Sequence, residues 1–192
     1  IAILSNNTVW VRGYNGYGEF GNGSSSGSLY CIGYNVNDVA GFGHSIAIVK
    51  ENGTLWTSGN NGNGQLGLGD NSARNIFTKV SLENTQKVKY IKGSLRNLVV
   101  LAQDNKLYAS GYNEFGQLSN GTLTPSNVLS LMLNSDETEV LNALFIEAGY
   151  DKNTAIIRED GTVWLSGDNS YGQMGESSST KKKKKMGEGF LN

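Results

Sequence analysis

The residues of this chain that could do chemistry begin with two glycine patterns. Gly16-x-Gly18-x-x-Gly21 and Gly62-x-Gly64-x-x-Gly67 have the spacing with which a glycine loop holds the pyrophosphate of a dinucleotide. That chemistry needs a strand before the glycines and a helix N-terminus after them. Here a loop rich in Gly, Asn and Ser follows, and the pattern recurs along the chain. We therefore expect no cofactor-binding residue in either pattern.

A second set of reactive side chains imitates a hydrolase. Ser24–Ser26 lie between two glycines, as in a nucleophile elbow, and Asp38 and His44 follow in the order of a catalytic triad. An elbow needs a strained strand-to-helix turn, whereas a Ser/Gly run is ordinarily a flexible loop. A metal site needs several ligands, and His44 is the only histidine and Cys31 the only cysteine. We expect no catalytic and no metal-binding residue, with His44 bonding backbone groups between repeats.

The elements that would have to position these residues come from an internal repeat. An aromatic residue followed by Gly-x-Asn and then by two spaced glycines occurs four times, about 50 residues apart. The aromatic anchors are Trp10, Trp56, Tyr108 and Trp164. A period of this length is typical of solenoids, propellers and arrays, in which each unit buries its apolar face against its neighbours. The repeat thus predicts the architecture before it predicts any function.

Each aromatic anchor ends a predicted β-hairpin. Two β-rich runs flank a short turn at Asn52-Gly53, Asp104-Asn105 and Asp160-Gly161, which favours type I′ turns with two positive φ angles. A further β-rich run precedes each hairpin, so that a unit holds three or four short antiparallel strands, the content of a propeller blade. The polar stretches between units are predicted loops, and the segment 128–144 is predicted to contain a helical turn or an insertion.

Composition limits the classes of function. The chain has 192 residues, 26 glycines, one proline and a net charge of −1. It holds no apolar run of about 18 residues that could span a membrane as a helix. The balanced charge gives no bias toward nucleic acid, so nucleic acid is not an expected partner. One cysteine excludes an internal disulfide and is compatible with both a cytosolic and an extracellular location.

Residues Gly53–Asp70, preceded by Gly41-Phe-Gly-His44, resemble the repeat of the regulator of chromosome condensation family. In that family the turn, the aromatic residue, Gly-x-Asn and Gly-Gln-Leu-Gly follow in this order, and the resemblance covers nearly the whole chain. It implies an all-β, seven-bladed propeller of four-stranded blades, of which this chain would be about half. The expected units are 1–36, 37–87, 88–144 and 145–192. Because Ile1 falls within a unit, we expect a fragment of a larger propeller whose remaining blades lie in the same or another chain.

Two sets of residues are candidate contacts. Aromatic residues gather around the glycine motif and suit a protein contact, because tyrosine combines apolar area with a polar tip. They are Tyr14, Tyr17, Phe20, Tyr112, Phe115 and Tyr171. A lysine run could contact anions, although a solvated, self-repelling loop explains it better. It consists of Lys181, Lys182, Lys183, Lys184 and Lys185.

We expect a non-enzymatic interaction or structural module with a protein partner. The favoured context is a bacterial or phage surface or virion-associated protein used for adhesion or assembly, ahead of a cytoplasmic scaffold. Some family members catalyse guanine nucleotide exchange on a small GTPase, which is a second possibility, although none of the loops responsible can be matched here. Inhibition of a secreted enzyme by loop aromatics is a third. Function on such a scaffold resides in its loops.

Overall fold

The computed structural model describes residues 2–3, 8–82, 87–149, 152–175 and 182–188, which form 15 strands. The first sheet has three strands, β1 (Ala2–Ile3), β2 (Val9–Val11) and β3 (Tyr30–Gly33). The second has four, β4 (Val36–Phe42), β5 (Ser45–Lys50), β6 (Leu55–Gly59) and β7 (Arg74–Lys79). The third has β8 (Val88–Gly93), β9 (Asn97–Ala102), β10 (Leu107–Gly111) and β11 (Ser126–Leu131). The fourth has β12 (Ala143–Ala148), β13 (Asn153–Arg158), β14 (Val163–Asp168) and β15 (Lys182–Glu188).

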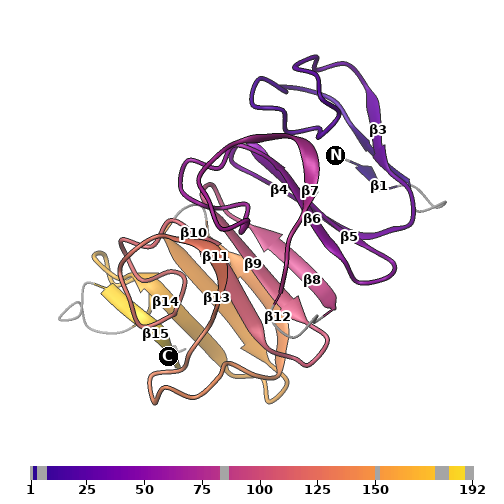
Figure 1. Cartoon of the computed structure of the whole chain (residues 1–192). Coiled ribbons are helices and arrows are strands. Elements are labelled where there is room, and N and C mark those ends of the chain that lie inside the picture. The colour runs from indigo at the N-terminus through magenta and orange to yellow at the C-terminus, as the bar shows by residue number, and fades with distance from the viewer. Residues whose placement is uncertain (1, 4–7, 83–86, 150–151, 176–181, 189–192) are drawn as a thin grey trace.

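The four sheets follow one another in a row, in the order of the chain (Figure 1). Every sheet is an antiparallel meander of consecutive strands, and the first strands of neighbouring sheets, β4, β8 and β12, approach one another. Two polar contacts join these strands: the amide of Ile91 donates to Asp38 Oδ2 at 2.8 Å, and Lys92 Nζ lies 3.9 Å from Glu147 Oε2. This is the all-β blade architecture that the repeat predicts. Within the described ranges, no helix is long and apolar enough to cross a membrane.

The hairpin turns form where the sequence predicts them, but with a different geometry. The amide of Gly53 donates to the carbonyl of Lys50 at 2.8 Å, and the amide of Lys50 donates to the carbonyl of Thr54 at 3.0 Å. Only the third loop residue has positive φ, at +79° for Gly53, +63° for Asn105 and +82° for Gly161. These are three-residue hairpins with one left-handed residue, so the predicted type I′ turns are wrong.

A chain of side-chain hydrogen bonds explains the sequence Asn-Gly-Thr-x-Trp around the second hairpin. Asn52 Oδ1 accepts hydrogen bonds from the amide and the hydroxyl of Thr54, at 3.1 and 2.7 Å. The Thr54 hydroxyl in turn accepts from the indole of Trp56 at 3.0 Å. Asp160, Thr162 and Trp164 repeat the arrangement in the fourth sheet. The anchor tryptophan is therefore held by the turn that precedes it.

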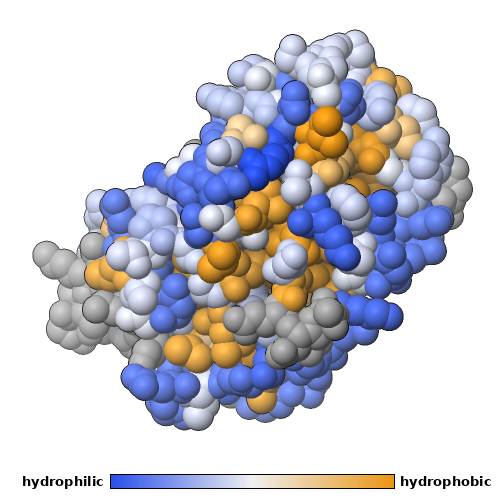
Figure 2. Space-filling model, viewed as in Figure 1, coloured by the Kyte–Doolittle hydropathy of each residue, from blue (hydrophilic) through white to orange (hydrophobic). Residues whose placement is uncertain are grey.

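The cores lie between sheets. We call the side of a sheet that is turned toward the next sheet along the chain its forward face, and the opposite side its rear face. Ala47, Val49 and Leu55 on the forward face of the second sheet pack with Leu98 and Val100 on the rear face of the third, and all five are buried. Similar clusters join the first sheet to the second and the third to the fourth. Figure 2 shows apolar side chains in a band across the middle of the molecule.

Two segments differ from the sequence-based expectation. The segment 128–144 holds no helical turn, because β11 continues to Leu131. An isolated bridge then pairs Leu133 with Glu139 around a short turn, so the alternative of an insertion is not contradicted. The lysine run is not a loop over its described part, because the backbone of Lys182–Lys185 lies in β15 and pairs with β14. Lys181 lies outside the described residues. Alternation of residue types is absent in the lysine run, so nothing in its sequence marks it as a strand.

Candidate functional site

The surface most able to make contacts is formed by loops at one end of the sheets. The loop after the third strand of a unit lies beside the turn between the first two strands, because Asn60 donates to the carbonyl of His44 at 2.7 Å and Tyr112 to that of Arg96 at 3.1 Å. We call this surface the loop face. It comprises 13–21, 43–44, 59–67, 94–96, 111–119, 152 and 167–175. The opposite ends carry the three-residue hairpins, which we call the hairpin face.

One buried asparagine organises each loop. Asn113 is fully buried, its Oδ1 accepts from the amide of Leu118 at 2.9 Å, and its amide group donates to the carbonyls of Thr122 and Thr124 at 3.2 and 3.0 Å. Asn15, Asn61 and Asn169 accept the same hydrogen bond from the residue five positions on. These asparagines are the Asn of Gly-x-Asn, for which no role was predicted from the sequence. Their recurrence at the same position of every unit could have identified them as structural residues. A buried side-chain amide can both donate and accept hydrogen bonds, which suits a residue that holds a loop together.

The residue after the second glycine closes the turn. The side-chain oxygens of Gln65, Gln117 and Gln173 accept from the amide two residues earlier, at 2.9 to 3.1 Å, as expected from their amide chemistry. Glu19 makes the same hydrogen bond to the amide of Tyr17 at 3.0 Å. The substitution of a carboxylate for an amide therefore preserves the loop and places at this position an acidic group that the other three loops do not have there.

The loops are fastened to the following sheet by hydrogen bonds from serine or threonine hydroxyls. The Ser58 hydroxyl donates to the carbonyl of Glu19 at 2.6 Å, and the Ser110 hydroxyl donates to that of Gln65 at 3.2 Å. We call the contact between two neighbouring sheets a junction. In the third junction, between the third and fourth sheets, the Thr154 hydroxyl donates to the carbonyl of Gln117 at 2.8 Å. Each donor is buried, so that these hydrogen bonds fix the position of one sheet against the next.

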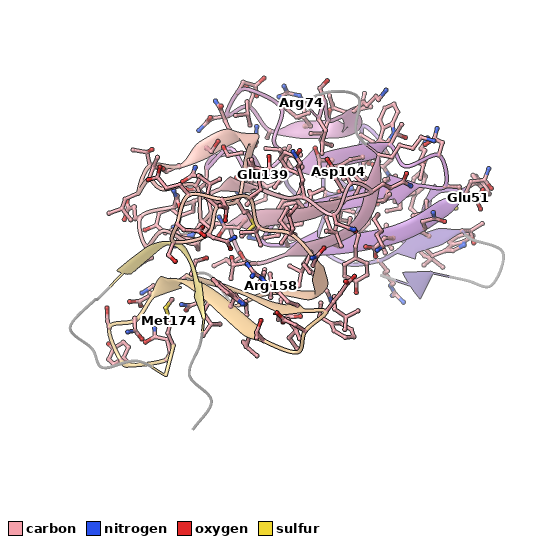
Figure 3. The ribbon with its side chains drawn as sticks, turned by 90° about the horizontal axis from the view of Figure 1, so that it is seen from below. Glu51, Arg74, Asp104, Glu139, Arg158 and Met174 are labelled. Atoms are coloured by element: carbon pink, nitrogen blue, oxygen red, sulfur yellow. The ribbon has the colours of Figure 1, made fainter. Side chains whose placement is uncertain are left out.

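The candidate aromatic contacts divide into exposed and buried side chains. Tyr14, Tyr17 and Tyr171 are 65%, 45% and 91% exposed. Phe20 is 3% exposed and belongs to the core between the first two sheets, so it is a packing residue and not a contact. Figure 3 labels Met174, which occupies the matching buried position in the last loop.

Two more of the aromatic candidates already carry a cation. Tyr112 and Phe115 are partly buried. The Arg96 guanidinium lies 3.8 Å from the centre of the Tyr112 ring, and Lys152 Nζ lies 4.5 Å from that of Phe115. Such contacts are favourable electrostatically and cover the ring faces.

His44 lies between the first two sheets, but it does not make the backbone hydrogen bonds that we expected. Its Nδ1 is 3.4 Å from Glu19 Oε1, and its ring contacts Tyr14 and Tyr17 with centroid distances of 5.3 and 4.8 Å. The side chain is 52% exposed. The backbone bonds of this turn come instead from main-chain groups and from Ser45, whose hydroxyl donates to the carbonyl of Asn60 at 2.7 Å.

The hydrolase-like residues are engaged elsewhere. Asp38 accepts from the amides of Ile91 and Val39, at 2.8 and 2.9 Å, while His44 pairs with Glu19. Cys31 is partly buried, and its Sγ lies 3.6 Å from the carbonyl of Gly33. Among the described residues no group of three or more His, Cys, Asp or Glu side chains could hold a metal ion.

Two of the carboxylates with shifted pKa values, Asp38 and Asp168, help to hold sheets or loops. Burial raises the pKa of Asp38 above its ordinary value of 3.8, although the amides of Ile91 and Val39 and the charge of Lys92 act in the opposite direction. Burial would also raise the pKa of Asp168, but hydrogen bonds from the hydroxyl and amide of Ser170 outweigh it, and the pKa is lowered. Both groups are explained by their role in holding sheets and loops.

Comparison with known families identifies one unit. Residues 52–99 match the family described as the regulator of chromosome condensation (RCC1) repeat. This stretch begins at the hairpin turn of the second sheet and ends in β9, so it covers one full period with its serine-fastened loop. No match is found among curated protein sequences.

Solved structures show the same fold. Prp20p from Saccharomyces cerevisiae, described with its binding to Gsp1p and histones, is 15% identical, with a TM-score of 0.79 over 96% of this chain and 47% of that one. Yeast Prp20 bound to Kap60 gives the same identity and TM-score, with 96% and 45% covered. Human WBSCR16 is 21% identical, with a TM-score of 0.77 over 93% and 46%. This chain spans about half the length of these structures.

Proposed function

Because this chain is built of regulator of chromosome condensation repeats, we propose that it is a protein-binding propeller module that contacts its partner through the loop face. The observation that carries the proposal is the exposure of Tyr14 and Tyr17, at 65% and 45%, on a loop held rigid by Asn15. Large, exposed aromatic side chains on a rigid frame lose little conformational freedom on binding. We propose no catalytic role.

The comparisons do not support the biological context that was favoured from the sequence. The well-matched solved structures come from yeast and human proteins, and nothing in the comparisons favours a bacterial or phage surface role. Prp20p is described as binding Gsp1p and histones, which keeps nucleotide exchange on a small GTPase as the alternative. At 15% identity the similarity concerns the fold, so it does not transfer a partner to this chain.

Photo-crosslinking tests the proposal. A benzoyl-phenylalanine is placed at Tyr14, at Tyr17 or, as a control on the hairpin face, at Asn52, and each protein is irradiated in a lysate of the source organism. We expect one shared adduct from Tyr14 and Tyr17 and none from Asn52. Adducts from Asn52 alone, or the same adducts from all three positions, would contradict a specific loop face. If the adduct is a GTPase, its rate of nucleotide release is measured with and without this chain.

We also propose a partner for the forward face of the fourth sheet. Phe145 and Ile157 on that face are 60% and 40% exposed. They border a hollow of about 490 Å³ that Tyr90 and Lys92 of the third sheet also line. Leu101, which matches Ile157 in the third sheet, is 3% exposed because the fourth sheet covers it. Continuity with the three junctions indicates a further blade as the occupant, with a Ser or Thr hydroxyl directed at the carbonyl of Gln173.

The first sheet of a second copy is a poor candidate for this position. Arg12 stands where Ser58, Ser110 and Ser166 stand in the later sheets, and it is exposed. A guanidinium in place of a buried hydroxyl would require desolvation of a charge in the junction. The expected occupant is therefore a different blade of the same or another polypeptide.

Thiol labelling tests this second proposal in a Cys31→Ser background. Ile157→Cys is compared with Ile76→Cys, a control that is 62% exposed on β7. We expect fast labelling at both positions in residues 1–192 alone, and slow labelling only at position 157 in the protein isolated from its source. Equally fast labelling at position 157 in both preparations would refute a covering blade.

A further inference from the structure

The first two sheets meet at a cluster of partly exposed rings on the loop face. We call Tyr14, Tyr17, His44 and Glu19 the tyrosine cluster. The Tyr14 and Tyr17 ring centres are 6.1 Å apart, and the His44 ring lies within 5.3 Å of each. Glu19 lies at the edge of the cluster with 7% of its side chain exposed, and it lines a hollow of about 350 Å³ together with Tyr14, His44 and other residues. The cluster thus combines exposed ring faces with a nearly buried carboxylate.

The contact between the third and fourth sheets also has an aromatic ring at this place, and it contains its own cation. Lys152 of the fourth sheet occupies the position of His44, and Phe115 occupies that of Tyr17. Lys152 Nζ lies 4.5 Å from the centre of the Phe115 ring. In the tyrosine cluster, by contrast, no Lys or Arg of the described residues lies over either tyrosine ring. Two positions therefore differ together: a Lys is replaced by His44, and the Gln of the turn is replaced by Glu19.

These replacements change the charge of the junction in one direction. They remove a permanent positive charge and add a carboxylate, whose oxygens meet the amide of Tyr17 at 3.0 Å and His44 at 3.4 Å. Aromatic ring faces attract cations, and a partly desolvated carboxylate strengthens that attraction. Arg12 lines the same hollow, but no ion pair joins it to Glu19. The junction has the elements of a cation site, with its cation supplied from outside.

We propose that the tyrosine cluster binds a cationic side chain, Lys or Arg, of a partner protein. The inference rests on the proposed function in one respect, namely that the loop face meets a protein. The alkyl stem of the side chain would lie along the Tyr14 ring, and the charged group would lie over the ring faces beside Glu19. The position of Lys152 on Phe115 provides the internal precedent for this arrangement.

Titration with small probes tests the site without a partner. Butylammonium and butylguanidinium are added to the chain, with uncharged butanol as the matched control, and the ring signals of Tyr14, Tyr17 and His44 are followed by NMR. We expect saturable shifts with at least one cation and weaker, non-saturating shifts with butanol. Equal responses to butanol would show an apolar patch, and the absence of any response would show that no site exists. Either result would overturn the proposal.

Three variants identify the groups responsible. Glu19→Gln restores the residue of the other three loops, so the fold is retained, and it is expected to weaken cation binding about fivefold or more. His44→Lys supplies an internal cation, as Lys152 does, and is expected to abolish binding. Arg12→Gln removes a like charge from the hollow and is expected to leave affinity unchanged or raise it. Unchanged affinity in both Glu19→Gln and His44→Lys would refute the assignment.

The outcome is separable from that of the proposed function. If the probes bind but crosslinking at Tyr14 yields no adduct, the site exists and the partner assignment fails. If crosslinking succeeds and no probe binds, the loop face is a contact surface without a cation site. If both succeed, Glu19→Gln must also reduce the yield of the Tyr14 adduct, and an undiminished yield would contradict the proposed role of the cation.

Discussion

Replacement of Asn113 by alanine is the most direct test of how the loop face is built. Asn113 is fully buried between β10 and the loop that follows it, and its side chain joins the amide of Leu118 to two loop carbonyls. Alanine leaves the buried Leu118 amide without this acceptor, at a cost of about 1 to 3 kcal/mol. The lost hydrogen bonds to the carbonyls of Thr122 and Thr124 add about 1 kcal/mol. The total is about 3 kcal/mol.

Urea denaturation followed by the fluorescence of the tryptophans measures this change. With a dependence on urea of about 2 kcal/mol per molar, the midpoint should fall by about 1.5 M. Asn52→Ala is the matched control, because Asn52 is exposed on the hairpin face and accepts only local hydrogen bonds from Thr54. We expect it to cost less than about 1 kcal/mol.

Asn113→Asp separates the donor from the acceptor. A carboxylate can still accept from the Leu118 amide, but it meets the carbonyls of Thr122 and Thr124 with a negative charge in place of a donor. The pKa of the introduced carboxyl should be raised on folding, so the destabilisation should be largest at neutral pH and should diminish as the pH falls. The reasoning is refuted if Asn113→Ala shifts the midpoint no more than Asn52→Ala.

Three further predictions concern the frame. Gly64→Ala should cost at least about 2 kcal/mol of folding free energy, because φ is +77° and a Cβ would lie 2.5 Å from a backbone atom of β11. Gly69→Ala is the control, because its φ is +87° but the space around it is open. It should cost about 1 kcal/mol in the same urea titration. Because the pKa of Asp38 is raised on folding, its favourable contribution is present below 3.8 and is lost as the pH rises through the folded-state pKa. Asp38→Asn should therefore be no less stable than the unmodified chain at neutral pH, provided that its amide oxygen still accepts from the amide of Ile91. It should also remove part of the pH dependence of stability. A large loss of stability would show that the charge is needed. Ser110→Ala should cost about 1 kcal/mol in denaturation, and no change would mean that its 3.2 Å hydrogen bond is not a fastener between sheets.

The two middle strands of each four-stranded sheet were predicted well because a recognisable turn joins them. The runs ending at Asn52, Asp104 and Asp160 are followed by residues that tolerate positive φ, and the structure turns at all three. The turn type was wrong because Asn-Gly and Asp-Gly fit both two-residue and three-residue hairpins. Only the register of the flanking strands decides between them. The hydrogen bond from the amide of Lys50 to the carbonyl of Thr54 depends on both strands and cannot be predicted from the turn residues alone.

The last strand of each sheet was the hardest to predict. The segments Arg74–Lys79 and Lys182–Lys185 lack strict alternation of apolar and polar residues, which is the sequence signal of a half-buried strand. Their strand conformation follows from hydrogen bonding to β6 and β14. Tertiary pairing here overrides local sequence preference, and the same reason explains why the segment 128–144 does not form a helical turn.

The residue types of the candidate site could be predicted from the sequence, but their exposure could not. The aromatic residues could be selected by type, but only the structure separates Phe20, which is 3% exposed, from Tyr14, which is 65% exposed, six positions earlier in the same loop. The difference arises from the direction in which the Asn15 side chain holds the loop, since Oδ1 of Asn15 binds the amide of Phe20 and turns that residue inward. Burial in such a loop follows from its hydrogen bonds and from packing against the next sheet, neither of which shows as a periodicity in the sequence.

The same frame explains how one junction could acquire a binding role at little cost in stability. The turn requires only an oxygen acceptor two residues beyond an amide, and Glu19 satisfies it as well as Gln65 or Gln117 does. The position of His44 holds Arg96 and Lys152 in the later sheets, and each of these three side chains lies near an aromatic ring. Charge at these two positions is therefore free to vary without disturbing the buried asparagines or the serine fasteners. The loop face can change its ligand junction by junction, and the tyrosine cluster is the junction in which the charges differ from those of the others.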